Sequence, residues 1–240
     1  MTLLSANRLI KRFNGLLAVD GVGLDVPHGQ VRALIGPNGA GKTTLVGMLS
    51  GRIAPSSGRI TFDGNDVTSW PAHKRIAAGI SYTFQITSIF PNLSVWENVA
   101  LAARRKRTTT EAVENAVRAA LDEVGLEARQ TVDAGDLSYG HQRLLEIAMG
   151  LAQAPKLLIL DEPTQGLADG EVADFVRLLA KLRGHITVLL IEHNMDVVMQ
   201  VADFVTVLDS GRVIFEGAPE EVKASETVQV AYLGGGDAAA

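Results

Sequence analysis

Short runs rich in apolar residues alternate with longer stretches of helical periodicity along most of this chain. Residues 31–35, 157–160, 186–191 and 204–208 are such runs, and their length and β-branched content predict buried strands. Residues 171–183 carry apolar side chains at helical spacing and are followed by a glycine, which predicts a helix. This alternation predicts an α/β fold with a mainly parallel sheet and helices on both of its faces.

The N-terminal region has a different pattern. Strands around Leu9 and Val22 and the segment 61–67 are separated by Gly, Asn and Asp turns, which predicts an antiparallel β subdomain beside the main sheet. Near the other end, residues 209–211 read as a hairpin turn that leads into a strand at 212–216.

The middle of the chain, about residues 92–155, has almost only helical periodicity and predicts a helical subdomain. Within it, Thr108 and Glu111 have the spacing of a capping box, and Gly125 follows the last apolar residue of the same predicted helix. The basic run 104–107 lies just before this helix. Such a run is either solvated loop charge or a contact for an acidic partner or a membrane surface.

The composition narrows the class of protein. Lys and Arg number 22 and Asp and Glu 27, so the formal net charge is −5, which argues against nucleic acid as a partner. Apolar residues make up 47%, enough for a sizeable core. The absence of cysteine excludes disulfides, zinc–thiolate sites, iron–sulfur clusters and cysteine nucleophiles.

The sequence shows neither a membrane span nor a secretory signal. Its apolar runs are far shorter than the ~20 residues that a spanning helix needs. The N-terminus lacks a continuous apolar segment of the kind found in signal peptides. We therefore expect a cytoplasmic location, with one domain over residues 1–236 and a disordered tail at 237–240.

A complete phosphate-loop motif follows the first predicted core strand. Its residues fill every fixed position of G-x-x-x-x-G-K-[ST], and they are Gly36, Pro37, Asn38, Gly39, Ala40, Gly41, Lys42 and Thr43. Glycines let backbone N–H groups converge on phosphate oxygens, and the helix that begins here adds its positive end. Lys42 supplies a cation for the outer phosphates, and the Thr43 hydroxyl is a ligand for Mg²⁺. The alternative is a glycine-rich turn with a chance lysine.

Two carboxylates end the predicted strand at 157–160. Asp161 is placed to hold Mg²⁺, and Glu162 to polarise an attacking water as a general base. Ligands bind at the carboxyl ends of strands in open α/β sheets, so the position suits this chemistry. A strand that simply ends in two solvated acids is the alternative.

Between these two motifs, the segment 137–142 (LSYGHQ) precedes a predicted helix and resembles the signature segment of ATP-binding cassette (ABC) proteins. Other motifs resemble the same family in its order. Gln85 resembles the glutamine of the Q-loop, and His193 the switch histidine after the last core strand. Phe13 resembles the aromatic residue that stacks on adenine, although a ring on an edge strand also fits a place in the core. The resemblance covers nearly the whole chain.

The resemblance implies a phosphate-loop NTPase core with an N-terminal antiparallel β subdomain and a helical subdomain, and ATP and Mg²⁺ as cofactors. It implies that Glu162 and His193 are catalytic and that Thr43, Gln85 and Asp161 lie at the metal. The residues expected to bind nucleotide are Phe13, Gly36, Pro37, Asn38, Gly39, Ala40, Gly41, Lys42, Thr43, Thr44, Gln85, Ser138, Gly140 and Gln142. In the family, two chains enclose two nucleotides head to tail, and the signature segment of one chain meets the terminal phosphate held by the other.

Two departures from the commonest family pattern matter. Tyr139 and His141 stand in the signature segment in a form that resembles the ATPases of branched-chain amino acid importers. Residues 83–85, 90–98 and 231–234 resemble that group as well, whereas Ala168 and Asp169 stand where the family usually has Asp or Asn followed by Pro. Either Asp169 takes the usual role from a shifted loop, or communication between subunits is weakened there.

These resemblances imply an ATP-hydrolysing subunit that energises a membrane importer for branched-chain or related amino acids. We expect it at the cytoplasmic face of the membrane, paired with a same or related ATPase subunit and with permease subunits, and indirectly with an external substrate-binding protein. The alternatives are the ATPase of a urea or short-amide importer, that of a lipopolysaccharide-type exporter, a non-transport ABC ATPase, and a phosphate-loop kinase.

Overall fold

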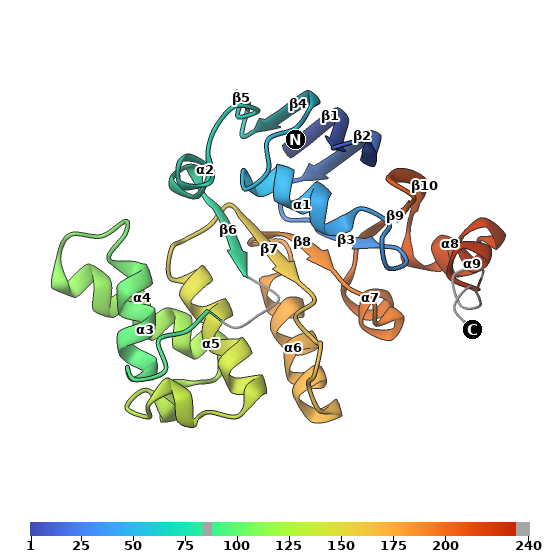
Figure 1. The fold of residues 1–240 in the computed structure, drawn as a ribbon. Coiled ribbons are helices and arrows are strands. Elements are labelled where there is room, and N and C mark those ends of the chain that lie inside the picture. Colours follow the sequence, from blue (N-terminus) through green and yellow to red (C-terminus); the bar gives the residue numbers. More distant parts are fainter. Residues whose placement is uncertain (84–87, 234–240) are drawn as a thin grey trace. The chain divides into compact units, whose positions relative to one another are not determined.

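The computed structural model describes residues 1–83 and 88–233. The chain forms two compact units, each described by itself below (Figure 1). The first unit contains residues 1–78 together with the C-terminal part from residue 183 onward, and the second contains residues 79–182.

An antiparallel sheet forms the N-terminal part of the first unit. The long strands β1 (Thr2–Phe13) and β2 (Leu16–Pro27) form a hairpin, and β4 (Ser57–Phe62) pairs with the other edge of β1. The short β5 (Asn65–Asp66) completes the order β2-β1-β4-β5. The antiparallel subdomain is therefore confirmed, with a tight turn at residues 63–64 inside the segment expected to extend over 61–67.

Parallel strands form the other sheet of this unit. The strand β3 (Val31–Ile35) lies between β8 (Thr187–Ile191) and β9 (Phe204–Asp209), and it is parallel to both. The strand β10 (Arg212–Gly217) adds an antiparallel edge next to β9. All residues of β3 and β8 are buried, which explains their almost uninterrupted apolar sequences.

The described part of the first unit also contains helices, one of which joins β8 to β9. They are α1 (Lys42–Ser50), α2 (Ala72–Ala78), α7 (Met195–Val201), α8 (Pro219–Ala224) and α9 (Glu226–Leu233). One core cluster joins β3 and β9 to the last three of these helices, through Ala33, Ile35, Val198, Ala202, Val205, Val207, Val222 and Val228. The strand β3, which leads into the phosphate loop, thus packs in one core with α7, α8 and α9.

The second unit contains a parallel strand pair and most of the helical segments. The strands are β6 (Ile80–Thr83) and β7 (Leu157–Asp161). The helices are α3 (Val95–Ala103), α4 (Thr110–Val124), α5 (Tyr139–Leu151) and α6 (Asp169–Leu182), with short 3-10 turns at Glu127–Arg129 and Ala134–Asp136.

The start of α4 corrects one prediction. The cap is Thr109, whose hydroxyl accepts from the Ala112 N–H at 3.3 Å, so a capping box between Thr108 and Glu111 is wrong. Because the helix begins one residue later, Glu111 is its second residue, one position too early for the capping-box contact. The other end is as predicted: Gly125 adopts the left-handed conformation that ends α4.

The basic run 104–107 packs partly onto its own unit. Arg104 is the C-terminal cap of α3, and Arg107 donates to the carbonyl of Ala152 at 2.5 Å. Burial and then the charges of Arg107 and Lys156 lower the pKa of Lys106 from its usual value. Whether the exposed cations also meet a partner stays a prediction.

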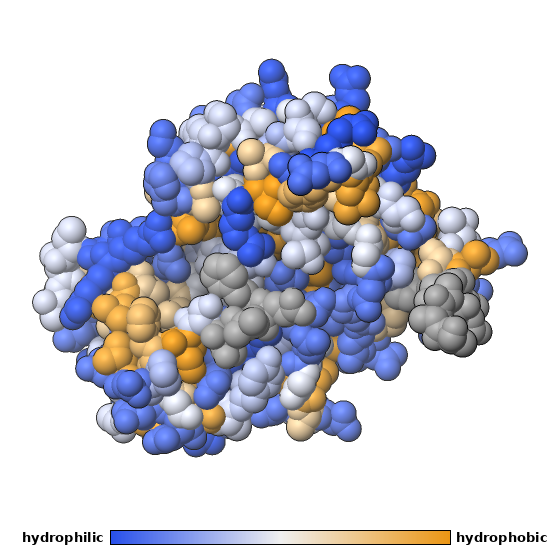
Figure 2. Space-filling model, viewed as in Figure 1, coloured by the Kyte–Doolittle hydropathy of each residue, from blue (hydrophilic) through white to orange (hydrophobic). Residues whose placement is uncertain are grey.

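Hydrophobic side chains reach the surface over α3 and α4 in the view of Figure 2. Exposed large hydrophobic residues of this unit include Phe90, Leu101 and Tyr139. Within residues 1–83 and 88–233, no helix combines the length and the apolar character needed to cross a membrane.

Candidate functional site

The phosphate-loop residues connect β3 to α1 through a curl that glycine makes feasible. Gly39 and Gly41 have φ of 79° and 99°, in the left-handed region, and Gly36 has φ of 150°. A Cβ on Gly36 would lie 2.0 Å from the Leu208 carbonyl oxygen, and one on Gly41 would lie 2.5 Å from that of Ala18. These contacts are with backbone, which cannot easily give way, so the loop requires glycine at both positions.

The Lys42 side chain folds back along the loop. Its Nζ donates to the carbonyl oxygens of Gly36 at 2.6 Å and Pro37 at 2.9 Å, and only 6% of the residue is exposed. The ammonium group is therefore held against the beginning of the loop. Ala40 is buried, whereas Asn38, Gly39 and Thr43 are exposed and Thr44 is half-buried at the first turn of α1.

The strand register brings His193 to the same sheet edge as the loop. Because Leu34 of β3 is paired with Ile191 of the parallel strand β8, both strands end together. The buried Glu192 accepts from the backbone N–H groups of His193 at 2.8 Å and Asn194 at 3.0 Å. This turn leaves the His193 side chain exposed beyond the end of β8.

Phe13 lies at the tip of the β1–β2 hairpin, where 42% of it is exposed. The ammonium of Lys11 lies 4.8 Å from the centre of its ring. Since the ring is not in the core, the alternative of a purely structural Phe13 loses its support, and adenine stacking stays the prediction.

The two predicted carboxylates differ in environment. Asp161 is 5% exposed at the end of β7, and its Oδ2 accepts from the Tyr82 hydroxyl at 2.5 Å. Glu162 is half-buried and has φ of 48°, a left-handed conformation that a non-glycine residue seldom adopts. Such strain concentrates at functional sites, because the fold must hold it in place.

The signature segment forms the start of α5. Ser138 is its N-cap, and the Ser138 Oγ accepts from the His141 N–H at 3.3 Å and lies 2.7 Å from His141 Nδ1. Gln142 Nε2 donates to the carbonyls of Ala134 and Leu137. The structure therefore places Ser138, Gly140 and Gln142 together at one helix terminus, where free N–H groups favour an anion.

A carboxylate of the same chain sits at this terminus. Glu171 Oε1 accepts from the Ser138 hydroxyl at 3.2 Å, and its Oε2 accepts from the Ala168 N–H at 3.1 Å. A Cβ on Gly140 would lie 2.2 Å from the Glu171 carboxylate. Sequence reasoning missed Glu171, since its contact with the signature segment joins residues far apart in sequence. Asp169 is the exposed first residue of α6, and its role stays a prediction.

A buried ion pair inside α5 was also missed. Arg143 and Glu146 are 3% and 6% exposed, and Arg143 Nη1 donates to Glu146 Oε2 at 2.9 Å. The other carboxylate oxygen accepts from the Ser88 N–H at 2.7 Å. Burial raises the pKa of the Glu146 carboxyl above its usual range, and the hydrogen bonds from Ser88 and Arg143 oppose this shift.

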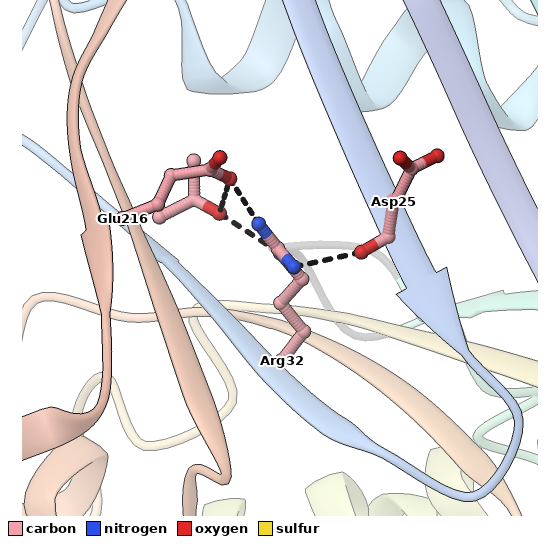
Figure 3. Close-up of polar contacts among 4 residues, drawn as sticks. Asp25, Arg32 and Glu216 are labelled. Carbon is pink, nitrogen blue, oxygen red and sulfur yellow. Dashed lines mark hydrogen bonds and ion pairs between the residues drawn. The ribbon is translucent and has the colours of Figure 1, made fainter. Parts of the chain in front are cut away.

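Another buried charge, Arg32, lies in β3, the strand that leads into the phosphate loop (Figure 3). Arg32 donates to the Asp25 carbonyl at 2.7 Å and to the Thr206 hydroxyl at 2.9 Å, and it forms an ion pair with Glu216. Burial lowers the pKa of Arg32 from its usual value, and Glu216 acts in the opposite direction. This cluster ties β3 to β2, β9 and β10. Gln85 and the tail 237–240 lie outside the described residues.

Comparisons with known proteins agree with this arrangement. A family profile described as ABC transporter matches residues 19–165, and one described as branched-chain amino acid ATP-binding cassette transporter matches residues 212–238. The high-affinity branched-chain amino acid transport ATP-binding protein BraF of Pseudomonas aeruginosa is 40% identical, with 97% of this chain and 98% of BraF aligned.

Solved structures share the fold. The ADP conformation of MJ1267, an ATP-binding cassette of an ABC transporter, has a TM-score of 0.90 at 30% identity, covering 98% of this chain and 99% of that one. A dimeric structure of MJ0796, a bacterial ABC transporter cassette, has a TM-score of 0.81 at 23% identity, with coverage of 90% and 99%.

A parallel strand that leads through a complete phosphate loop into a helix defines a phosphate-loop NTPase. Within that class, the chain belongs to the ABC transporter family, as an ATP-binding subunit with ATPase activity.

Proposed function

We propose that this ATPase subunit energises a membrane importer for branched-chain or related amino acids. The observation that carries the proposal is the similarity to BraF over nearly the full length of both chains. The profile described as branched-chain amino acid ATP-binding cassette transporter adds support. It matches residues 212–238, the C-terminal segment that contains β10 and α8.

In this proposal the loop between β3 and α1 holds the phosphates of ATP. Lys42 leaves the carbonyls of Gly36 and Pro37 to meet the outer phosphates, and Phe13 stacks on the adenine. Thr43, Asp161 and Gln85 would hold Mg²⁺, which prefers oxygen ligands of the hydroxyl, carboxylate and carbonyl types that these side chains offer. The bound ion would neutralise charge on the outer phosphates.

Hydrolysis requires a base and a contact to the terminal phosphate. We assign Glu162 to the first role, because a strained backbone holds its carboxylate at the end of a buried strand. His193 takes the second role, because the turn after β8 leaves its ring exposed at the same sheet edge as the phosphate loop.

Assembly follows from the start of α5. Ser138, Gly140 and Gln142 would meet the nucleotide of a second ATPase subunit, of the same or a related chain. The exposed Phe90 and Leu101 support docking to permease subunits at the cytoplasmic face of the membrane. An external binding protein would deliver the substrate to the permease. In this reading residues 1–236 act as one ATPase domain, with residues 92–155 as its helical part.

Uptake by cells tests the substrate. In a strain that lacks this gene, the wild-type gene should restore uptake of radiolabelled leucine, isoleucine and valine, whereas Lys42→Ala should not. Lys181→Ala is the matched control, because it removes an exposed lysine of α6 that has no place in the proposed site.

The outcome also separates the alternatives. Uptake of urea or a short amide that depends on this gene, with unchanged amino acid uptake, would contradict the proposed substrate but not the ATPase. Full amino acid uptake with Lys42→Ala would contradict the assignment of the loop itself.

A further inference from the structure

The hairpin turn between β9 and β10 lies against the phosphate loop. The N–H of Gly211 donates to the Ala40 carbonyl at 2.9 Å, and the carbonyl of Gly211 accepts from the Asp20 N–H at 2.8 Å. The turn therefore links the middle of the phosphate loop to β2 by two backbone hydrogen bonds.

The same turn is packed without spare room. A Cβ on Gly211 would lie 2.9 Å from the Ala18 carbonyl oxygen, the same atom that approaches Gly41. At the other end of the loop, the carbonyl of Leu208 fills the space beside Gly36. Backbone atoms at the end of β9 and in the turn thus lie against the beginning and the middle of the loop.

An ion pair between Arg212 and Asp20 connects the residue after the turn to β2. The Arg212 guanidinium donates to Asp20 Oδ2 from two nitrogens, at 2.6 and 2.8 Å. The Asp20 N–H also bonds Gly211, so the backbone of Asp20 holds the turn and its side chain holds Arg212, the first residue of β10.

We propose that Gly211 is a positioning residue for ATP binding, which acts by holding the Ala40 carbonyl and with it the curl of the phosphate loop. This rests on the proposed nucleotide site at residues 36–43. Backbone N–H groups bind phosphate only if they converge, and a displacement near 1 Å spoils such an arrangement. The turn bonds the loop at Ala40, between the ends by which the loop joins β3 and α1.

Two glycine substitutions separate positioning from general backbone strain. Gly211 has φ of 78° and Gly64 has φ of 76°, so alanine meets nearly the same conformational penalty at both. A Cβ on Gly64 meets nothing within 4 Å, whereas one on Gly211 meets Ala18. Gly64→Ala is therefore a matched control in the same unit of the chain.

The measurement is calorimetric titration of the full chain with ATP and Mg²⁺, alongside thermal unfolding. Gly211→Ala should raise the Kd for ATP by about ten- to a hundredfold, because the turn or Ala18 must move and the loop moves with it. Gly64→Ala, which meets the conformational penalty but no contact with Ala18, should lower the melting temperature less and leave the Kd unchanged. Equal Kd values for the two variants would overturn the proposal.

Two further variants complete the test. Gly211→Asn accepts the left-handed backbone but keeps the Cβ contact, so its Kd should rise as in Gly211→Ala; a wild-type Kd would contradict the steric argument. If Gly211→Ala does not fold, Arg212→Ala still decides. It should raise the Kd severalfold relative to Arg177→Ala, which breaks another exposed ion pair, and no rise would overturn the proposal.

A last control distinguishes this inference from the proposed nucleotide site. If Lys42→Ala abolishes ATP binding while Gly211→Ala matches Gly64→Ala, only the positioning role is wrong. If Lys42→Ala binds ATP normally, the site assignment itself is wrong.

Discussion

The loop between β3 and α1 and the start of α5 are both helix N-termini predicted to receive phosphate, yet they are built in opposite ways. The loop is shaped by glycine conformations and by backbone neighbours such as the Leu208 carbonyl. Within the described chain, no side chain caps α1. The start of α5 is formed by side chains: Ser138 caps the helix, and Glu171 lies against it.

This difference separates a loop whose backbone is already shaped for phosphate from a helix start whose side chains must rearrange. Backbone atoms cannot swing away, so the loop keeps its shape only with glycine at the crowded positions. Side chains can move, and a phosphate at α5 must displace or tolerate the Glu171 carboxylate. The first site is a property of one chain, whereas the second is expected to work only against a facing subunit.

The largest expected effect concerns catalysis. Glu162→Gln should lower turnover by about 10²–10⁴-fold, because it removes the general base and keeps the shape of the side chain. ATP binding at the loop should be retained. Phosphate release and an ATP titration measure the two quantities, with Glu123→Gln in α4, which is half-buried like Glu162, as control. Turnover within a few-fold of wild type would move the role of base to His193.

The same variant tests the facing subunit. Glu162→Gln should sediment as a dimer with ATP and Mg²⁺ and as a monomer with ADP, because the terminal phosphate links the loop of one chain to α5 of the other. Salt should weaken this dimer. A monomer under all conditions would point to an unlike partner or to a wrong assignment of residues 137–142. Ser138→Arg in the reconstituted transporter then decides, since it should block turnover only if α5 faces a phosphate.

A pair of alanine variants compares the two sites directly. Gly36→Ala should lose about 2–6 kcal/mol of unfolding free energy, since its Cβ meets the Leu208 carbonyl and its φ is unfavourable. Gly140→Ala should change stability little, because the atom it meets is the end of the Glu171 side chain, and alanine favours a helix by about 0.5–1 kcal/mol. Denaturant unfolding measures both, and equal losses would contradict the contrast.

The buried Glu146 carboxyl should make the stability of α5 depend on pH. Burial raises the pKa of Glu146, so the folded chain holds this proton to higher pH than the unfolded chain. Its stabilising contribution is therefore complete below the unfolded pKa and is lost as pH rises through the folded pKa. Glu146→Gln should remove this dependence and cost roughly 1–3 kcal/mol near neutrality, because an amide cannot accept from both Ser88 and Arg143. If the unfolding free energy of the variant depended on pH as in the wild type, Glu146 would not be the source of this dependence.

Phe13→Ala should weaken ATP binding by roughly 1–3 kcal/mol, the contribution typical of one stacked base. Stability should be almost unchanged, because the ring is exposed at a hairpin tip. Discrimination between ATP and GTP should stay poor, since stacking contacts the face of a base and not its edge. Unchanged ATP affinity would remove Phe13 from the site.

The parts that the sequence predicted well are those set by neighbours in the chain. The buried strand β3 agrees with its predicted limits, and the phosphate loop follows it as its glycine pattern required. The start of α4 was one residue off, because Thr108 and Thr109 offer the same hydroxyl and only packing chooses between them.

The features that the sequence did not predict depend on contacts between segments distant in sequence or on tertiary packing. An Arg143–Glu146 pair at helical spacing reads as an exposed pair, and only the packing around α5 shows that it is buried. The hydrogen bond between Gly211 and Ala40 joins segments far apart in sequence, and no local sequence pattern predicts it. Glu171 was missed for the same reason.

The smallest expected effect concerns Glu171 at the start of α5. Its carboxylate accepts a hydrogen bond from the Ser138 hydroxyl. A phosphate oxygen would need the same donor, and the negative charge of Glu171 would repel the phosphate. Glu171→Gln keeps an oxygen for the Ala168 N–H and removes the charge. In the Glu162→Gln background it should lower the ATP concentration for half-maximal dimerisation by roughly twofold to tenfold, the equivalent of one hydrogen bond of about 0.5–1.5 kcal/mol. Asp174→Asn removes the same charge one turn further along α6, and should leave the ATP requirement unchanged. A higher ATP requirement in Glu171→Gln would mean that Glu171 prepares Ser138 for the phosphate, and that the start of α5, like the backbone of the loop, is shaped before the phosphate binds.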